Sequence, residues 1–469
     1  MTDRETYDKS SVESIYKYSI QLTGKTLLDM ATDVSELIKK SNKGDLGSLV
    51  EKHFFHHSPP NNHSPDFEDA GLELKTTGVV KRKSGLQAKE RLVLTMINYE
   101  TLVEETWTTS TLLSKCRLML VLFYEYEKEV TVEKRKFLLP PLVVEIDRVG
   151  AKHSKKELDF LTKSAFRIPP EDLATIRKDW ELIQSKVRAG KAHELSEGDT
   201  YFLGACRKGA GGPKEPLRVQ PFSAIKAKAR AFCLKQGYVT SLIQEHGSEV
   251  RILRPGANKT LEEATLEKFN PFIGESLDAL SKKFDHYRKS KNHKGFKRAI
   301  AQFMLSSDGG TVAELQMGNI EMKTVALERN GRPRESMSFP AFDYMKIVNQ
   351  DWEESEFFER IERKILFVIF QKDKDGVERF RGASFWNMPH SDRLEAKRVW
   401  EEAKRRIKAG ESALPAKTES RVAHVRPKAK DGSDRARTPA GTFEVKKCFW
   451  LNNSYIAEVL TPILQKLPK

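Results

Sequence analysis

Residues 72–75 alternate between apolar and charged side chains, a period of two that is typical of a β-strand with one buried face. On such a strand Glu73 and Lys75 lie side by side, while the leucines face the other way. Asp66 comes seven residues before Glu73, and Gly71 supplies a turn between them. We therefore expect Asp66 to come alongside Glu73.

The apolar pattern of the remaining chain predicts an α/β fold. Two helices are followed by several strands, among them an apolar strand over 118–123. A helix over 170–188, further strands and a terminal helix come next. This order of elements predicts a central mixed sheet flanked by helices.

The same pattern occurs twice along the chain. The tetrad at 73–76 recurs at 321–324, and the apolar strand at 118–123 recurs at 365–370. The other matching segments are 43–51 with 294–302, 89–91 with 334–339, 179–190 with 399–410, and 232–239 with 449–456. Because chance similarity does not keep its order over six blocks, we infer a tandem duplication.

The joint between the repeats falls near 247–263, where Arg254-Pro255-Gly256 breaks any regular element. We predict a first domain over 1–250, a linker over 251–263 and a second domain over 264–469. The segment 410–441 is rich in Lys, Arg, Ala and Pro, so we expect a loop insertion there.

Asp66, Glu73 and Lys75 form a candidate catalytic group. Two carboxylates at a sheet edge suit Mg²⁺, a hard cation that prefers oxygen ligands and often binds phosphate oxygens as well. A neighbouring lysine can orient or deprotonate an attacking water, or neutralise charge on a pentacovalent transition state. The alternative is a solvated strand face, since the Glu-x-Lys pattern is common. The pattern alone does not decide for a metal-dependent nuclease.

The repeats differ at this candidate site. Between the first and the second repeat, Glu51 becomes Gln302, Asp66 becomes Glu314 and Lys115 becomes Glu362, whereas Glu321 and Lys323 retain the Glu-x-Lys pair. A lost or misplaced carboxylate disturbs the near-octahedral coordination of Mg²⁺, and a glutamate in place of a lysine repels phosphate. We predict that the second repeat does not cut, the alternative being an active site with rearranged ligands.

The chain carries 81 Lys and Arg residues against 66 Asp and Glu, a net charge of +15 that suits a nucleic-acid partner. A solvated basic surface is the alternative. The 4 cysteines are widely spaced, which argues against a zinc site and a disulfide framework. The charged N-terminus is no signal peptide, and no apolar run approaches a membrane span. We expect a reducing, cytoplasmic compartment.

Both repeats carry a basic run at corresponding places. The first has Arg207-Lys208, and the second has Arg426-Pro427-Lys428 followed by Arg435 and Arg437. Arginine can bond guanine O6 and N7 in a bidentate way, and lysine reaches the same acceptors. Non-specific attraction to phosphates is the alternative. The occurrence of a basic run at the same place in both repeats favours a DNA-binding role for Arg207, Lys208, Arg426 and Lys428.

Residues 43–51, Asp66-Phe67 and 70–76 resemble the signature of the MutH mismatch-repair nucleases. Over the whole length, the chain looks closer to the GATC-cutting type II restriction endonucleases of that family (the Sau-three-A type). The segments that carry this closer resemblance are 89–94, 190–198, 225–232 and 335–339. The resemblance implies two tandem MutH-like domains of the PD-(D/E)xK restriction-endonuclease fold.

The resemblance also implies roles for individual residues. Asp66 and Glu73 would be the metal ligands, with Glu51 assisting, and Lys75 and Lys115 would be the catalytic lysines. Arg426-Pro427-Lys428 looks closer to the base-reading loop of MutH than the first repeat does. The first repeat departs from MutH at Cys206, where MutH has an arginine, which puts its base contacts in doubt.

The implied activity is a Mg²⁺-dependent double-strand cut of DNA at GATC, 5′ of the guanine, in a prokaryotic cytoplasm. The second repeat would be an allosteric domain that binds effector DNA. Because each chain would have one complete catalytic site, we expect a monomer in solution that pairs with a second chain on DNA and loops the DNA. The alternatives are a nicking endonuclease of the repair type and a catalytically inactive, site-specific DNA-binding protein.

Overall fold

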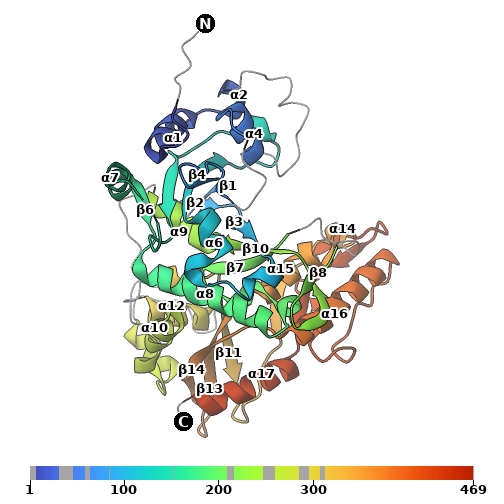
Figure 1. Ribbon diagram of the computed structural model, residues 1–469. Helices are drawn as coiled ribbons and strands as arrows, with labels where there is room; N and C mark the ends of the chain where they lie inside the picture. The colour runs from blue at the N-terminus through green and yellow to red at the C-terminus, as the bar shows by residue number, and fades with distance from the viewer. Residues whose placement is uncertain are drawn as a thin grey trace.

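The computed structural model describes residues 7–30, 46–58, 64–83, 85–151, 153–208, 216–246, 259–284, 295–306 and 312–467. Figure 1 shows the first repeat, in blue to green, packed against the second repeat, in yellow to red. Both are built of helices and strands, as the α/β prediction requires. Within the described ranges, no helix has the length and apolar character that a membrane crossing needs.

The described helices of the first repeat are α1 (Val12–Ser19), α2 (Leu27–Met30), α4 (Leu46–His53), α5 (Tyr99–Leu102), α6 (Thr111–Cys116), α7 (Lys155–Ser164), α8 (Pro170–Arg188) and α9 (Gln236–His246). Its strands are β1 (Leu72–Arg82), β2 (Gly85–Ala88), β3 (Leu92–Met96), β4 (Leu118–Glu125), β5 (Leu142–Glu145), β6 (Ala165–Arg167), β7 (Leu203–Arg207), β8 (Arg218–Gln220), β9 (Ser223–Ala227) and β10 (Arg230–Leu234). The expected helix over 170–188 is therefore present with those bounds.

Two sheets organise the first repeat. The larger has the strand order β2-β1-β4-β5-β6 and mixes parallel and antiparallel neighbours. The smaller has the order β3-β10-β7. In the central parallel pair Glu73 lies opposite Met119, which places the start of β1 beside the end of α6.

The described helices of the second repeat are α10 (Leu261–Glu267), α11 (Leu277–Lys283), α12 (Phe296–Leu305), α13 (Ala313–Met317), α14 (Tyr344–Ile347), α15 (Glu356–Glu362), α16 (His390–Lys408) and α17 (Asn453–Lys466). Its strands are β11 (Glu321–Leu327), β12 (Met337–Ala341), β13 (Ile365–Lys372), β14 (Glu378–Trp386), β15 (Ala423–Pro427), β16 (Arg435–Arg437), β17 (Phe443–Val445) and β18 (Lys447–Leu451). The sheets β11-β13-β14 and β12-β18-β15 repeat β1-β4-β5 and β3-β10-β7 in the same order.

The duplication extends to details of packing. Trp107 packs edge-on against Trp180 in the first repeat, with ring centroids 6.0 Å apart, and Trp352 packs against Trp400 at 5.7 Å in the second. The backbone two residues before the glutamate of each Glu-x-Lys pair is left-handed, with φ +60° at Gly71 and φ +54° at Asn319. The same turn therefore leads into β1 and β11.

Two sequence expectations differ from the structure. Helix α10 begins at Leu261, inside the expected linker, with Thr260 as its N-cap; residues 247–258 lie outside the described ranges. The expected loop insertion at 410–441 is wrong, because this segment contains β15 and β16. Its lysines and arginines are exposed, whereas Ala423 and Val425 are buried in the core. The basic composition therefore suggested a loop where the chain forms a strand.

The two repeats pack closely against each other. A Cβ atom added to Gly237 of α9 would lie only 1.7 Å from the backbone oxygen of Gln316 in α13. One added to Gly198 would lie 2.8 Å from the backbone oxygen of Glu362. Glycine at these positions therefore permits backbone contact across the interface. One apolar cluster contains buried residues from both repeats, including Tyr238 and Phe370.

Candidate functional site

Asp66 and Glu73 are brought together by the turn at Gly71. Phe67 pairs with Leu72 across this turn. The backbone N–H of Leu74 donates to Asp66 Oδ2 at 2.9 Å, and the backbone N–H of Asp66 donates to Glu73 Oε2 at 3.1 Å. Each carboxylate is thus oriented by the backbone next to the other, and both are buried. The sequence expectation that Asp66 lies alongside Glu73 is confirmed.

Both predicted lysines face these carboxylates. Lys75 Nζ lies 2.6 Å from Glu73 Oε1, as the alternation along β1 requires. Lys115 comes from the last turn of α6, and its Nζ lies 3.3 Å from Glu73 Oε2 and 4.0 Å from Asp66 Oδ1. It also donates to the backbone oxygen of Ser64 at 3.1 Å. Four side chains from three segments, the turn before β1, β1 itself and α6, therefore converge.

Glu51 lies on α4, close enough to this group to sense its charges. Burial, followed by the charges of Asp66 and Glu73, raises the pKa of Glu51 to about 7. Burial is also the main cause of the raised pKa of Glu73, and the charge of Asp66 adds to it. Burial and the negative charge of Asp66 thus raise the pKa of both Glu51 and Glu73, and a bound cation would stabilise their charged forms.

The donor set fits the metal that the family resemblance implies. Carboxylate oxygens are the ligands that Mg²⁺ prefers, and the Lys115 ammonium already lies within 4.0 Å of oxygens from both Asp66 and Glu73. In the described part of the chain, no three His, Cys, Asp or Glu side chains are grouped as a complete metal cage. Mg²⁺ commonly needs only one or two carboxylates, with water and phosphate completing its shell.

The second repeat retains one carboxylate under several cations. Lys323 Nζ lies 2.8 Å from Glu321 Oε1, and Arg360 Nη1 lies 3.7 Å from Glu321 Oε2. Burial raises the pKa of Glu321, but the charges of Lys323, Arg360 and Arg363 outweigh it, so the pKa is lowered. This shift is opposite to that of Glu73, because Glu73 has the carboxylate of Asp66 beside its two lysines, whereas the charges that act on Glu321 are all cations.

The expected equivalence of Lys115 with Glu362 is corrected by the strand register. Glu73 lies opposite Met119, and Glu321 lies opposite Ile365, so counting back from the strands does not lead to Glu362. Arg360 instead occupies the place of Lys115 beside the glutamate. Glu362 turns away to the first repeat, where its Oε1 lies 4.0 Å from Arg230 Nη2.

The other two predicted positions of the second site lie on helices. Gln302 lies on α12 and lines a cavity of about 290 Å³ together with residues of α9 and α13. Glu314 belongs to α13, and its side chain lies outside the described residues. Lys323 lines a different cavity. The second repeat thus has a neutral Gln302 on α12 where the first has the acidic Glu51 on α4.

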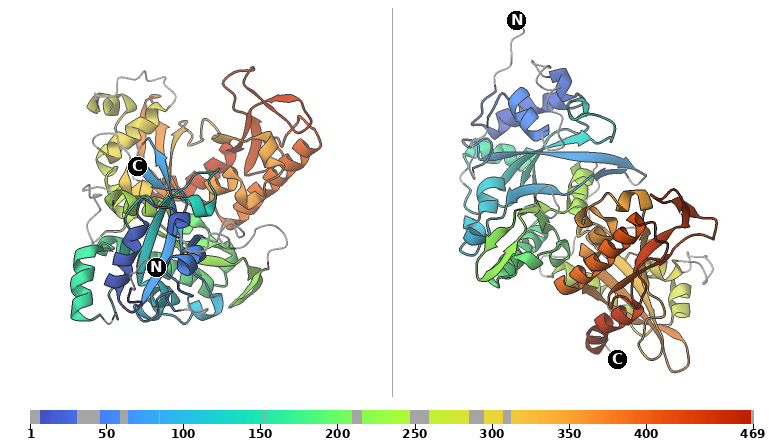
Figure 2. Two further views of the ribbon diagram at one scale, coloured as in Figure 1. Left: turned by 90° about the horizontal axis from the view of Figure 1, so that it is seen from above. Right: turned by 90° about the vertical axis from the view of Figure 1, so that its right-hand side faces the viewer.

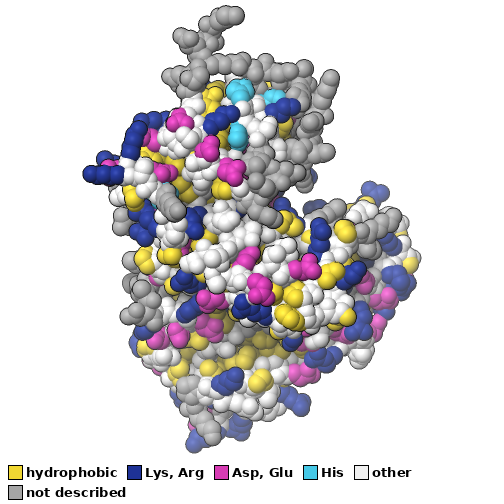
Figure 3. Space-filling model, viewed as in Figure 1, with side chains coloured by type: hydrophobic (Ala, Val, Ile, Leu, Met, Phe, Trp, Pro, Cys, Tyr) yellow, Lys and Arg dark blue, Asp and Glu magenta, His cyan; other side chains and the backbone are white. Residues whose placement is uncertain are grey.

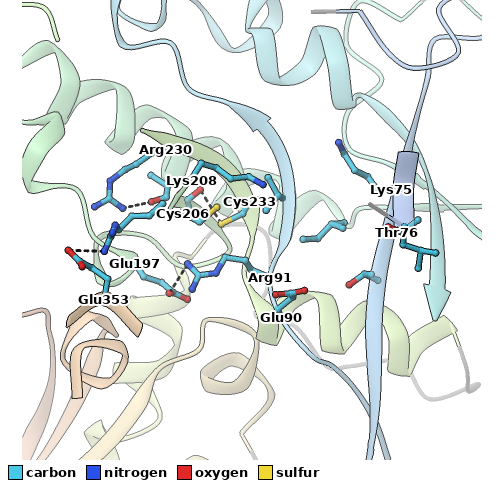
Figure 4. Close-up of a pocket in the computed structure, with 18 of the residues that line it drawn as sticks. Lys75, Thr76, Glu90, Arg91, Glu197, Cys206, Lys208, Arg230, Cys233 and Glu353 are labelled. Atoms are coloured by element: carbon cyan, nitrogen blue, oxygen red, sulfur yellow. Dashed lines mark hydrogen bonds and ion pairs between the residues drawn. The ribbon is translucent and has the colours of Figure 1, made fainter. Parts of the chain in front are cut away.

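A cavity of about 560 Å³ extends from Lys75 and Thr76 to the end of β7, where Arg207 and Lys208 lie. Figure 4 shows Lys75 and Thr76 on one side of it and Lys208, Arg230 and the two cysteines on the other. Lysine and arginine side chains also occur across both repeats on the face in Figure 3, interspersed with acidic ones. The cavity joins the candidate catalytic group to the predicted base-reading residues.

The second repeat contributes part of the wall of this cavity. Glu353 Oε1 lies 3.3 Å from Arg207 Nη1 and 2.7 Å from Lys228 Nζ. The Arg207 guanidinium also lies 5.8 Å from the ring centre of Phe358. The sequence analysis missed Glu353. Comparing the turns that follow α5 and α14 would have found it, because Thr108-Thr109 of the first repeat becomes Glu353-Glu354 in the second.

The register of the smaller sheets identifies the equivalent base-reading positions. Arg426 lies opposite Cys448, as Cys206 lies opposite Ala231, so Arg426 corresponds to Cys206. The Arg426 guanidinium lies 3.8 Å from the ring centre of Trp450. The same alignment makes Arg207 equivalent to Pro427 and Lys208 equivalent to Lys428. Lys428 donates to the backbone oxygen of Phe339 at 2.6 Å.

The first repeat has two thiols where the second has this stacked pair. Cys233 is equivalent to Trp450 by register, and both Cys206 and Cys233 are buried. Burial raises the pKa of Cys116, behind the catalytic group, to about 12. All four cysteines lie within the described ranges and are unpaired there. The departure from MutH at Cys206 therefore falls inside the predicted base-reading surface.

Comparisons with known proteins identify relatives over nearly the whole chain. The family model of the DNA mismatch repair enzyme MutH matches residues 55–157 and 305–395, one segment in each repeat. The type II restriction enzyme Sau3AI of Staphylococcus aureus is 31% identical over 512 aligned positions, covering 96% of this chain and 99% of that enzyme. The DNA mismatch repair protein MutH of Shewanella woodyi is 22% identical over 241 positions, covering 50% of this chain and 93% of that protein.

Both family segments include strands of a Glu-x-Lys sheet, β1 and β4 in one and β11 and β13 in the other. The two MutH-like regions thus coincide with the two repeats that the sequence and the topology define. Together with the match to the restriction enzyme over its full length, this shows that the chain is a type II restriction endonuclease of the Sau3AI family, related to the MutH nucleases.

Proposed function

We propose that this protein is a Mg²⁺-dependent restriction endonuclease that makes double-strand breaks at GATC, acting in a prokaryotic cytoplasm. The observation that carries the proposal is the convergence of Asp66, Glu73, Lys75 and Lys115, with Lys75 lining the same cavity as Arg207 and Lys208. A relative that matches over nearly its full length is a type II restriction enzyme, and GATC is the site implied by the resemblance in sequence. Cleavage is expected 5′ of the guanine.

Asp66 and Glu73 would hold the metal, with Glu51 assisting through water or by orienting Lys75. The ion, when bound, lowers the pKa of a water and offsets charge on the scissile phosphate. Burial of Lys75 is outweighed by the negative charges near it, Glu73 among them, which raise its pKa, so Lys75 stays protonated and positions the attacking water. Lys115 donates to the oxygens of the phosphate, where negative charge develops in the transition state. Glu51, with a pKa of about 7, accepts a proton near neutral pH.

The second repeat serves, in this proposal, as an allosteric domain that binds a second GATC site. Three features support it. Glu321 alone, beneath Lys323 and Arg360, is a poor metal site but leaves cations for a phosphate. The Arg426 guanidinium lies over the Trp450 ring, and Lys428 is held by the backbone oxygen of Phe339, so the predicted base-reading side chains of this repeat are pre-organised.

The contact of Glu353 with Arg207 and Lys228 supplies a route for communication. A carboxylate of the second repeat occupies cations that DNA in the first cavity would need. DNA must therefore displace Glu353, and we propose that effector DNA on the second repeat favours the displaced arrangement. The chain would be a monomer in solution that pairs on DNA and loops it, because each chain has one armed site.

Matched substitutions in the two repeats test the assignment. Asp66→Ala is expected to abolish Mg²⁺-dependent cleavage of GATC DNA while leaving binding in Ca²⁺ largely intact. Glu321→Ala removes the corresponding carboxylate of the second repeat and is expected to leave cleavage in place. Cleavage by Asp66→Ala at the wild-type rate would contradict the site assignment.

A single armed site also suits a nicking endonuclease of the repair type. The two functions differ in their products on supercoiled GATC plasmid. A restriction enzyme converts it to linear DNA, whereas a nicking enzyme accumulates open circles and requires no second site. A protein that binds GATC in every metal without cutting would instead be a site-specific DNA-binding protein.

A further inference from the structure

A hairpin in the first repeat exposes apolar side chains that nothing in the catalytic site uses. It consists of β8 and β9, and Figure 2 shows it in green, projecting from the edge of the first repeat. Phe222 at its tip is 75% exposed, and Leu217, Val219 and Ile225 are also exposed. Such a run of exposed apolar residues indicates an interaction surface rather than a core.

The hairpin is held in place, although its apolar side chains face solvent. Gln220, next to the turn, is buried and accepts a hydrogen bond from the backbone N–H of Ala192 at 2.7 Å. Tyr99 donates to the backbone oxygen of Lys228 at 2.7 Å. A Cβ added to Gly190 would lie 2.6 Å from the backbone oxygen of Phe222, so the tip rests directly on the chain after α8.

Phe222 adopts a left-handed backbone conformation, with φ +60°. This conformation is uncommon for a bulky residue, and a glycine at the same position would adopt it without strain. The tip therefore carries a phenylalanine where the backbone favours glycine and where the side chain buries almost nothing. Among the described residues, the Phe222 ring makes no ring or cation contact that would explain this choice.

The second repeat also has a hairpin with an exposed phenylalanine. The hairpin β16–β17 also projects in Figure 1, and its Phe443 is 61% exposed. Tyr344, the equivalent of Tyr99, donates to the backbone oxygen of Val445 at 2.8 Å. Gly410, like Gly190, has a positive φ and packs under the tip, where an added Cβ would lie 3.6 Å from Ala440 Cβ.

The position and charge of the hairpins indicate their partner. Each continues within two residues into the strand that pairs with the predicted base-reading strand, β10 beside β7 and β18 beside β15. Each hairpin also carries exposed cations on its strands, Arg218 and Lys226 in the first repeat and Arg435 and Arg437 in the second. The repeats differ in their catalytic residues but share this feature, so it serves binding rather than cleavage.

We propose that Phe222 and Phe443 contact DNA bases directly, stacking on or wedging into a base step beside each GATC site, while the cations on the hairpin strands hold phosphates. This inference rests on the DNA-binding function proposed above. Aromatic rings are suited to this contact because every base has a π-face, and apolar wedges unstack and kink a base step. The hairpins would thus help to distort the DNA that each repeat reads.

The test uses the full-length chain, Ca²⁺ in place of Mg²⁺, and a GATC duplex with 2-aminopurine at the base next to the site. Wild-type protein is expected to raise 2-aminopurine fluorescence through unstacking. Phe222→Ala is expected to lose this rise and to bind about tenfold more weakly, since a base–aromatic stack is of that strength. Leu158→Ala removes another exposed apolar side chain, on α7, and is expected to behave as wild type.

Phe222→Gly separates binding from folding. It is expected to weaken binding as alanine does but to leave the thermal midpoint unchanged or higher, because glycine suits φ +60°. Phe443→Ala is expected to reduce stimulation by added GATC oligonucleotide while leaving the 2-aminopurine signal from the first site in place. Lower thermal midpoints in both Phe222 variants would indicate a structural role and overturn the proposal.

The remaining outcomes are distinguishable. If Phe222→Ala binds DNA and raises fluorescence as wild type does, the ring does not contact bases. If it instead lowers the sedimentation coefficient of the protein alone, the hairpin is a contact between chains, which also overturns the proposal. If wild-type protein itself fails to prefer GATC over unrelated duplex, the proposed function fails first and the hairpin inference falls with it.

Discussion

The ion pairs of Glu353 across the repeat interface predict the response of the enzyme to a single charge change. Glu353→Gln keeps the size of the side chain but removes the negative charge that Arg207 and Lys228 both face. The closed arrangement of the cavity, in which Glu353 pairs with Arg207 and Lys228, would lose both ion pairs at once. Arg207 and Lys228 would then be available to DNA without prior displacement of a carboxylate.

The magnitude follows from distances and exposure. The two pairs span 3.3 and 2.7 Å, and the side chains of Arg207, Lys228 and Glu353 are 17%, 32% and 16% exposed. Such pairs lie between exposed bridges, worth about 0–1 kcal/mol, and desolvated interface pairs, worth more. A net preference of about 1–2 kcal/mol for the closed arrangement corresponds to a change of about 5- to 30-fold in its population.

The assay is single-turnover cleavage of a one-site plasmid in Mg²⁺, with and without a GATC oligonucleotide. Glu353→Gln is expected to cut the one-site plasmid about 5- to 30-fold faster than wild type and to respond less to the oligonucleotide. Glu354→Gln is the matched control, since it removes an equal charge from the same turn, and no ion pair of Glu354 occurs among the described residues. Comparing the two variants removes the general effect of charge on DNA attraction.

An unchanged one-site rate in Glu353→Gln, with full stimulation by oligonucleotide, would refute this reasoning. So would equal acceleration in both variants, which would reflect net charge alone. Thermal unfolding of each variant should accompany the kinetics, because loss of an interface contact could also lower stability.

Three further predictions follow from the site and the interface. Asp66→Ala and Lys75→Ala should each lower the cleavage rate by roughly 10³-fold or more while changing GATC affinity in Ca²⁺ little, as measured by gel shift and fluorescence anisotropy. Because the pKa of Glu51 is about 7, its carboxylate form, and with it the cleavage rate, should increase as pH rises through 7, and Glu51→Gln should remove this dependence. Gly237→Ala would place a Cβ 1.7 Å from the Gln316 backbone oxygen, so differential scanning calorimetry should show a loss of about 2–4 kcal/mol.

The sequence predicts the first-repeat site well because its information is local. Alternation of polarity fixes which side of β1 carries Glu73 and Lys75, and the turn at Gly71 fixes where Asp66 returns. The duplication can also be predicted from the sequence, since it rests on the order of the matching segments. Lys115 was reached through the family resemblance, and its helix indeed ends beside Glu73.

The failures concern positions that depend on tertiary packing. Aligning hydrophobic strands assigned Glu362 to the place of Lys115, but α15 is one residue longer than α6, and Arg360 meets Glu321 instead. The composition of 410–441 led to the prediction of a loop where the strand β15 forms. The role of Glu353 at the first cavity could not be predicted from local pattern, because it depends on how the repeats pack.

In the proposed function, the first repeat, which has the complete catalytic group, cuts DNA at GATC, and the second repeat stimulates this cleavage. Digestion of matched plasmids with zero, one and two GATC sites, in Mg²⁺ and in EDTA, tests this most directly. Mg²⁺-dependent double-strand cuts are expected at GATC, with none in EDTA or in the plasmid without a site, and with faster cleavage of two sites than of one. Binding without cleavage in any metal, or equal rates for one and two sites at high dilution, would contradict it.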